Sequence, residues 1–314
     1  MAHLAPRLEG GMRMNGGNLR ALTSRFGGQG VVFREAPGGL ESVEIENRHA
    51  TARVALQGAQ LLAWQPREEE PVIWVSPAAR FEPGVAIRGG VPICWPWFGP
   101  HATDPSLPQH GFARTAPWQV VAVERLYDDR TRLTFRLPDG AGSAGWPHET
   151  ELLYMITVGR ALELDLVTRN AGPAPITIGQ ALHTYFTVSD YERVTVHGVE
   201  GCRYLDKVEG GEKVQDRPLR LSGRTDRVYV ESVRDVVIED PGLGRAIRIA
   251  RRNSHSTVVW NPGYDGAAPA ADFGPDGSRG MLCVETANAG PDTVRLEPHA
   301  VHLLFTRYTL GPVG

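Results

Sequence analysis

The chain has 314 residues, and its 33 Lys and Arg against 36 Asp and Glu give a formal net charge of −3. A balance this close to neutral argues against a protein that binds nucleic acid through a general positive field. Hydrophobic residues make up 41% and charged residues 22%, which is typical of a folded globular protein and excludes a mainly disordered one.

Membrane and secreted classes are not favoured either. No stretch approaches the roughly 18 uninterrupted apolar residues that a membrane helix needs, and residues 1–25 contain no apolar segment of the kind found in secretion signals. The three cysteines, Cys94, Cys202 and Cys283, are far apart and fit neither a disulfide framework nor a zinc spacing. We therefore expect a cytoplasmic protein with reduced cysteines, no bound metal and no membrane association.

In chain order, residues 1–30 are rich in glycine, and we expect a loose N-terminal extension before a single domain over residues 31–314. Short runs in which apolar and polar residues alternate recur throughout that domain, bounded by Gly, Pro, Asn or Asp. They lie near 43–46, 118–124, 132–137, 162–166, 192–197, 228–233, 247–250 and 256–260. This period predicts about fifteen strands and little helix, hence an antiparallel sandwich or barrel.

The segment 87–114 (IRGGVPICWPWFGPHATDPSLPQHGFAR) breaks this alternation. Its aromatic and proline residues predict a rigid loop, and Arg88 and Arg114 stand near its two ends. Two guanidinium groups suit a phosphate or a carboxylate, because each offers a planar fork of donors. The alternative is that both arginines face solvent or pair with surface carboxylates.

Four other positions are candidates for chemistry. His183 lies in an apolar, strand-like run and could be a general acid or base, or a neutral buried imidazole. Glu285 ends an apolar run, where a carboxylate is costly unless it is paired or used, although it could cap the following turn. His110, next to Gly111, could equally be a turn residue, and Asp226 could be a turn or ion-pair residue.

Seven segments in order resemble one family. They are RGG-P-x-C-W-P-W-F-G, LPQHGFAR, LHTYF, TDRVY, VVWNP, ADFG and CVETAN, within about residues 42–308. Together they are similar to the D-hexose-6-phosphate mutarotases (glucose-6-phosphate 1-epimerases), a branch of the aldose 1-epimerase superfamily. The resemblance implies an all-β fold, a large antiparallel β-sandwich that holds a sugar in a cleft on its concave face.

The resemblance also implies an activity, the interconversion of the α and β anomers of a hexose 6-phosphate without a cofactor or metal. His183 would be the general acid and Glu285 the general base. The remaining matched residues would bind the substrate, with two arginines on its phosphate and His110 in a supporting position: Arg88, Gln109, His110, Arg114 and Asp226.

Mutarotation requires the ring to open at C1–O5, to rotate about C1–C2 and to close again, so one group must deliver a proton and another must remove one. We expect His183 to be charged and Glu285 ionised in the resting protein. The partner would be a small sugar phosphate, and we expect a monomer. Two alternatives stay open: an aldose 1-epimerase acting on an unphosphorylated hexose, and a non-catalytic protein that binds sugar phosphates.

Overall fold

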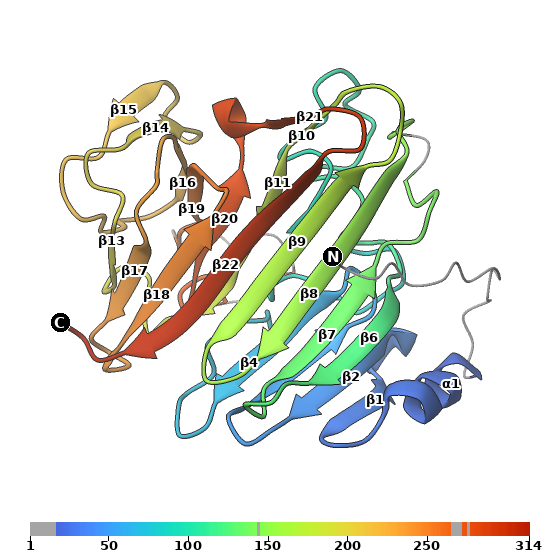
Figure 1. Ribbon diagram of the computed structural model, residues 1–314. Coiled ribbons are helices and arrows are strands. Elements are labelled where there is room, and N and C mark those ends of the chain that lie inside the picture. The colour runs from blue at the N-terminus through green and yellow to red at the C-terminus, as the bar shows by residue number, and fades with distance from the viewer. Residues whose placement is uncertain (1–16, 143–144, 265–271, 275–276) are drawn as a thin grey trace.

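The computed structural model describes residues 17–142, 145–264, 272–274 and 277–314, and antiparallel strands dominate it (Figure 1). One eight-stranded sheet, here called the first sheet, has the spatial order β13 (Thr195–His197), β17 (Val236–Asp240), β18 (Arg245–Arg252), β22 (Val301–Gly311), β9 (Leu162–Asn170), β8 (Thr150–Val158), β7 (Thr131–Arg136) and β6 (Gln119–Arg125).

The second sheet lies behind the first in Figure 1. Its order is β15 (Glu212–Val214), β14 (Arg203–Asp206), β16 (Thr225–Tyr229), β19 (Ser256–Asn261), β20 (Met281–Asn288), β11 (Gln180–Leu182) and β5 (Ile93–Cys94), and β12 (Tyr185–Thr187) also pairs with β20. Two smaller sheets complete the described strands: β1 (Val31–Glu35), β2 (Glu41–Glu46), β3 (Ala50–Ala55) and β4 (Gln60–Pro66) form one, and β10 (Ile176–Ile178) with β21 (Val294–Leu296) the other.

The long strands follow the alternation seen in the sequence. In β9, Leu162, Leu164 and Leu166 are fully buried while the residues between them are partly exposed. Burial of one such leucine side chain contributes about 1.5–3 kcal/mol, so a strand with this pattern is stable only with one face against a core. The all-β prediction is confirmed.

That core lies between the first sheet on one side and the second sheet together with the sheet of β1–β4 on the other, which makes the fold a sandwich. The ring of Phe186 in β12 packs edge-on against the ring of Tyr308 in β22, with centroids 5.0 Å apart. The hydroxyl groups of Thr184 and Tyr308 are 2.5 Å apart, and the Thr286 hydroxyl donates to that of Thr306 at 3.0 Å. Strands β12 and β20 therefore turn one face to the first sheet.

The described residues contain 22 strands, more than the sequence predicted. Several of the additional ones have only two or three residues, such as β5, β10, β11 and β15. An alternating pattern needs about four residues to be recognised, so these short strands carry no signal of their own.

Helix α1 (Gly17–Phe26) lies beside β1 (Figure 1). Its Leu19, Leu22 and Phe26, at helical spacing, pack against the main core. Residues 1–16 of the predicted extension lie outside the described residues, so the division into an extension and one domain stays a prediction. Two 3₁₀ turns, η1 (Pro37–Gly39) and η2 (Gly290–Asp292), are the other helical elements described. Within the described ranges, no helix is long and apolar enough to cross a membrane.

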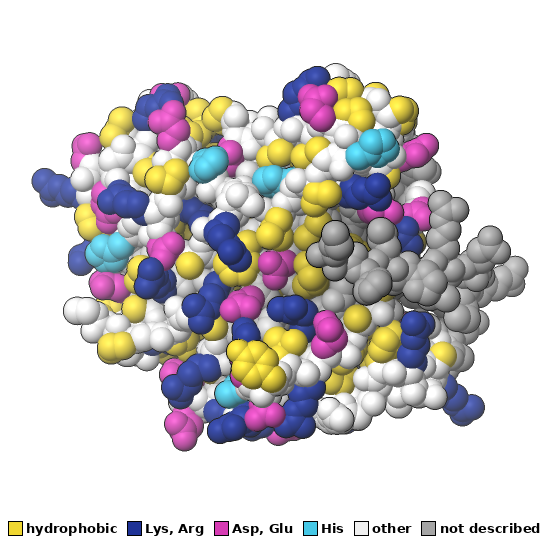
Figure 2. Space-filling model, in the orientation of Figure 1, with side chains coloured by type: hydrophobic (Ala, Val, Ile, Leu, Met, Phe, Trp, Pro, Cys, Tyr) yellow, Lys and Arg dark blue, Asp and Glu magenta, His cyan; other side chains and the backbone are white. Residues whose placement is uncertain are grey.

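The face of the molecule seen in Figure 1 carries cationic and anionic side chains interspersed with each other (Figure 2). Some of them form ion pairs across the first sheet, for example Arg169 with Glu151 at 2.9 Å. Exposed pairs of this kind contribute little to stability, about 0–1 kcal/mol each.

Candidate active site

Strand alternation places Glu285 on the face of the second sheet that is turned away from the first sheet. Leu282 and Val284 of β20 belong to the core shared by the two large sheets. Cys283 and Ala287 pack in separate clusters on the opposite face. Because side chains alternate along a strand, Glu285 shares the face of Cys283 and Ala287. We call this the outer face.

His183 reaches the same outer face from the link between β11 and β12. Its neighbour Thr184 points to the core, so His183 and Tyr185 point outward. The two rings stack with centroids 4.9 Å apart and planes inclined by 11°. His183 Nε2 lies 3.3 Å from Glu285 Oε1, and the two residues are only 8% and 1% exposed.

Burial controls the charges of this pair. It raises the pKa of the Glu285 carboxyl well above its ordinary value, and the nearby Asp226 carboxylate adds to the rise. It lowers the pKa of the His183 imidazole well below its ordinary value, and His110, Arg114 and Arg88 lower it further. The unliganded site therefore favours neutral His183 and protonated Glu285. Both shifts oppose the predicted charged pair, because burial disfavours the charged form of each group.

Each member of the pair also has an unsatisfied atom. Glu285 Oε2 and His183 Nδ1 are buried and have no hydrogen-bond partner among the described residues. An unmade hydrogen bond of a buried polar group costs about 1–3 kcal/mol. Such a cost in two side chains that contact each other is typical of a site that is completed by a ligand.

A tight turn brings His110 to this pair. Gly111 has φ +72°, and a Cβ at this position would lie 1.9 Å from the carbonyl oxygen of Trp95, so glycine is required. The backbone N–H of Gly99 donates to His110 Nδ1 at 3.2 Å, which leaves the ring proton on Nε2. Burial, with Arg114 and Arg88, lowers the pKa of His110 to about 3, and its ring centroid lies 5.8 Å from that of His183. His110 is thus a turn residue and also a neutral N–H donor beside the pair.

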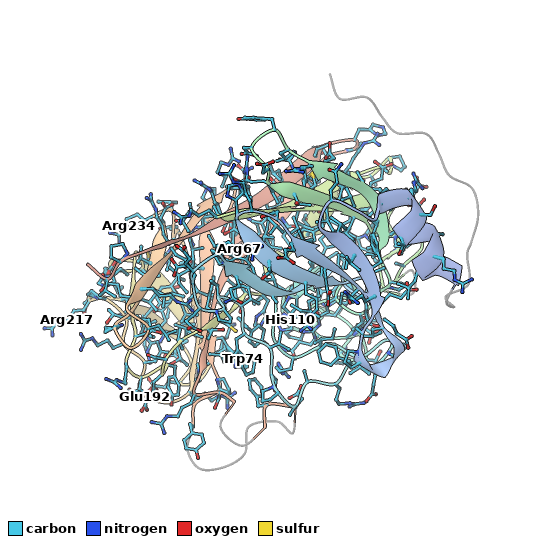
Figure 3. The ribbon with its side chains drawn as sticks, turned by 90° about the horizontal axis from the view of Figure 1, so that it is seen from below. Arg67, Trp74, His110, Glu192, Arg217 and Arg234 are labelled. Atoms are coloured by element: carbon cyan, nitrogen blue, oxygen red, sulfur yellow. The ribbon has the colours of Figure 1, made fainter. Side chains whose placement is uncertain are left out.

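Arg88 lies in the site and does not face open solvent. Its Nε donates to Asp272 Oδ2 at 3.0 Å and its Nη1 donates to the Tyr185 hydroxyl at 3.1 Å. Its guanidinium carbon lies 4.8 Å from the ring centroid of Phe273. Tyr185 therefore contacts both Arg88 and His183. In Figure 3, Trp74, which stacks on Tyr185, and His110 lie on the side of the molecule away from the first sheet.

Strand register places Asp226 on the outer face as well. Asp226 in β16 pairs with Trp260 in β19, and Trp260 pairs with Cys283 in β20. Its carboxylate is half-buried, and burial raises its pKa. Asp226 lies close enough to Glu285 for its charge to raise the pKa of that carboxyl.

Arg114 and Gln109 are joined to each other at the edge of the site. Arg114 Nη2 donates to the backbone oxygen of Gln109 at 2.8 Å. Arg114 is close enough to lower the pKa of both histidines and that of Glu285. The Gln109 side chain is exposed, and within the described ranges it makes no hydrogen bond to the other predicted site residues. Six of the seven predicted side chains are thus brought together, and Gln109 joins them through its backbone.

Asp272 was not identified by sequence analysis as a site residue. The sequence signal at this position is the resemblance of the ADFG segment, residues 271–274, which assigns no role to Asp272. In the part of the chain that the structure describes, no group of three His, Cys, Asp or Glu side chains is placed to hold a metal ion. The site thus offers a proton donor and acceptor 3.3 Å apart, with two cations nearby. This arrangement suits proton transfer on a polar ligand that carries an anionic group.

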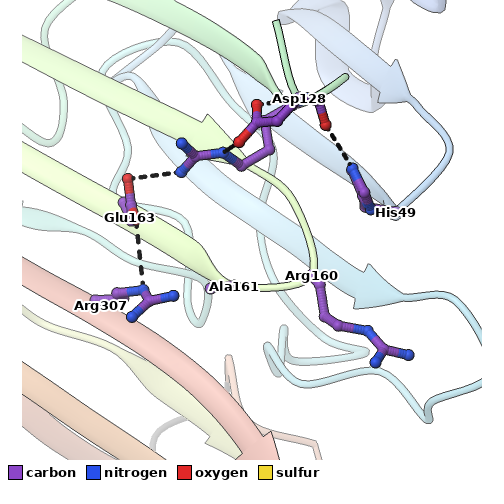
Figure 4. Close-up of a pocket in the computed structure, with 7 residues that line it drawn as sticks. His49, Asp128, Arg160, Ala161, Glu163 and Arg307 are labelled. Carbon is purple, nitrogen blue, oxygen red and sulfur yellow. Dashed lines mark hydrogen bonds and ion pairs between the residues drawn. The ribbon is translucent and has the colours of Figure 1, made fainter. Parts of the chain in front are cut away.

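A separate depression lies at the turns of the first sheet (Figure 4). It is lined by His49, Asp128, Arg130, Arg160, Ala161, Glu163 and Arg307. Arg130 already pairs with Asp128 at 2.7 Å and with Glu163 at 3.1 Å. None of the predicted site residues lines it, so it is not the site described above.

Comparisons with known proteins agree with this geometry. The family model for aldose 1-epimerase matches residues 41–309. A protein of Escherichia coli (strain K12), provisionally named glucose-6-phosphate 1-epimerase, is 39% identical over 276 residues, which are 87% of this chain and 92% of that protein. A Cenchrus ciliaris protein with the same provisional name is 32% identical, over 81% of this chain and 80% of its own length. The crystal structure of YeaD from Salmonella typhimurium, provisionally named a mutarotase, has a TM-score of 0.83 at 36% identity and covers 90% of this chain and 94% of its own.

Proposed function

The chain belongs to the aldose 1-epimerase family, and on this premise we propose that it interconverts the α and β anomers of a hexose 6-phosphate. The observation that carries the proposal is the buried pair of His183 and Glu285, 3.3 Å apart, beside Arg88 and Arg114. The name of the Escherichia coli relative supports glucose 6-phosphate as the substrate.

Ring opening needs one proton removed from the C1 hydroxyl and one delivered to O5 as the C1–O5 bond breaks. The pair of His183 and Glu285 holds one exchangeable proton, so it contains one acid and one base in either protonation state. In the neutral state His183 accepts the proton from the C1 hydroxyl and Glu285 delivers its proton to O5. In the charged state these roles are exchanged.

Closing the ring on the other face reverses the two transfers. A general acid or base contributes typically 10²–10⁴-fold, so two such groups are enough for a reaction that forms no covalent intermediate. Glu285 Oε2 and His183 Nδ1, which are buried and have no partner among the described residues, give the pair unused hydrogen-bonding capacity for a sugar.

The phosphate binds to Arg88 and Arg114 in this proposal. Both guanidinium groups lie close enough to the histidines to lower their pKa values, so both act on the same small region. A phosphate dianion would offset this positive field and favour protonation of His183. Its binding energy is remote from C1 and can hold the open chain while C1–C2 rotates. The two arginines therefore favour binding of a phosphorylated sugar over binding of a free hexose.

The other predicted residues contact the sugar. His110 offers its Nε2–H as a neutral donor, Asp226 offers a carboxylate acceptor, and Gln109 offers an exposed amide at the edge. A protein that only bound sugar phosphates would need neither a general acid nor a general base, so the buried His183–Glu285 pair favours an enzyme. We further propose that the enzyme is cytoplasmic and acts as a monomer.

The test is anomer exchange measured by two-dimensional NMR exchange spectroscopy on glucose 6-phosphate, with galactose in parallel. We expect acceleration for the phosphorylated sugar, and a 10²–10⁴-fold lower kcat in Glu285→Gln. The matched control is Glu212→Gln, which removes an exposed carboxylate that pairs with Arg203 at 2.7 Å and should leave the rate unchanged. Acceleration of galactose alone would replace the proposal with an epimerase of free hexoses. Binding of glucose 6-phosphate without acceleration would favour a sugar-phosphate sensor.

A further inference from the structure

Arg88 is held from three sides by residues to which no role in the proposed reaction has been assigned. Asp272 Oδ2 accepts from its Nε at 3.0 Å, and the Tyr185 hydroxyl accepts from its Nη1 at 3.1 Å. Phe273, which is 2% exposed, lies against its guanidinium plane. Asp272 and Arg88 are both mostly buried, with side chains 24% and 28% exposed. A surface arginine would lack this combination of partners.

These contacts leave part of the guanidinium free for a ligand. Arginine has five N–H donors, and Asp272 and Tyr185 each take one of them. The free donors include both N–H groups of Nη2, which has no hydrogen-bond partner within the described ranges. The donors of an arginine fork suit two oxygens of a phosphate. The fork is already oriented, so phosphate binding costs less of the roughly 2 kcal/mol of rotamer entropy that a free arginine loses.

We infer that Asp272 is a positioning residue for phosphate recognition, which with Tyr185 holds the Arg88 guanidinium so that its free N–H groups face the 6-phosphate. This inference rests on the proposed function and adds to it the residue that orients Arg88 for phosphate binding. Asp272 lowers the stability of the folded protein, because its Oδ1 is buried and has no hydrogen-bond partner among the described residues. An apolar residue in its place would avoid that cost but would release Arg88.

Two effects of Asp272 on phosphate binding oppose each other. Its hydrogen bond orients Arg88, which favours binding, while its negative charge weakens the attraction of Arg88 for an anion. The inference requires orientation to dominate. Asp272→Asn separates the two effects, because the amide oxygen can still accept from Arg88 Nε although the charge is gone. Asp272→Ala removes both.

A substitution at Tyr185 tests the orientation of Arg88 independently of Asp272. Tyr185→Phe removes the hydroxyl that accepts from Arg88 Nη1 and keeps the ring that stacks on His183. If orientation dominates, this variant weakens phosphate binding in the same direction as Asp272→Ala. The double variant should lose little more than Asp272→Ala alone, because both changes act through Arg88.

The experiment measures KM and kcat for glucose 6-phosphate and, by titration calorimetry, the Kd of inorganic phosphate. For Asp272→Ala we expect both KM and Kd to rise about tenfold or more, with kcat within about threefold of the wild type. For Asp272→Asn we expect both constants within about threefold of the wild type. The matched control is Asp235→Ala, which removes a half-buried carboxylate that pairs with Arg248 at 2.6 Å and should change neither constant.

Three results would overturn the inference. They are an unchanged Kd of phosphate in Asp272→Ala, a lower Kd in both Asp272 variants, and a fall in kcat with KM and Kd unchanged. The calorimetric arm does not depend on catalysis. If the wild type binds phosphate but accelerates no anomer exchange, the proposed function fails while the role of Asp272 is still decided by Kd. If the wild type does not bind phosphate, the inference fails as well.

Discussion

Replacing His110 with Asn tests whether its imidazole stays neutral in the folded protein. Burial and the two arginines lower its pKa to about 3, whereas an unfolded chain would have the ordinary value of 6.5. Between these values the unfolded chain binds a proton that the folded protein does not. His110 therefore costs no stability above pH 6.5, and stability is lost as the pH falls below it.

The magnitude follows from the same two pKa values. At pH 4.5, two pH units below the unfolded value, linkage gives a loss of about 3 kcal/mol from this one side chain. Asn is a suitable replacement, because it tolerates the left-handed φ of +66° at this position and its Oδ1 can accept the Gly99 N–H. The variant loses the edge-on contact with Phe98, at a cost of about 1 kcal/mol that does not depend on pH.

The assay is urea unfolding at pH 7.0 and pH 4.5, followed by tryptophan fluorescence. We expect His110→Asn to be less stable than the wild type at pH 7.0 and to lose up to about 3 kcal/mol less on acidification. His148→Asn, at an exposed histidine, is the control and should lose as much stability as the wild type. If the difference between His110→Asn and the wild type is the same at both pH values, His110 is not held neutral and the reasoning is wrong.

Three further predictions concern stability. The raised pKa of Glu285 means that the folded protein keeps a proton that the unfolded chain releases, so stability is lost as the pH rises above 4.5. In thermal scans, Glu285→Gln should therefore have a higher melting temperature than the wild type at pH 8, and the gain should be smaller at pH 5. Equal gains at both pH values would contradict this. Asn170, fully buried, donates to the carbonyls of Ala174 and Leu296 and accepts the Gly172 N–H, so Asn170→Leu should lose about 3 kcal/mol or more in urea unfolding. Gly111→Ala should lower both the melting temperature and the rate of anomer exchange, since its Cβ would overlap the Trp95 carbonyl; a variant with wild-type values would show that the turn can relax.

The sequence was sufficient for the fold class, because strand alternation is a local property. In residues 162–166, each leucine is buried on one face whatever sheet the strand joins, so period two is visible without knowing the partner strands. The short strands β5 and β11 were not visible. They exist because Ala181 and Leu182 pair with Cys94 and Ile93 from far along the chain.

The sequence also identified His183 and Glu285 as candidates, since a polar residue within an apolar run stands out locally. Their charges could not be predicted in the same way. A pKa depends on burial and on neighbouring charged or polar groups. The neighbours that lower the pKa of His183 are Arg88, His110 and Arg114, which lie roughly 70–95 residues earlier in the chain.

Asp272 marks what only the tertiary structure decided. It is separated from Arg88 by 184 residues, and its own segment carries no period and no ligand spacing. Its contact with Arg88 exists because the second sheet and the loops around it bring the two segments together. Residue type and local pattern determined which groups could take part in chemistry, whereas the distances, orientations and charges of those groups depend on contacts between distant segments, which a single sequence does not contain.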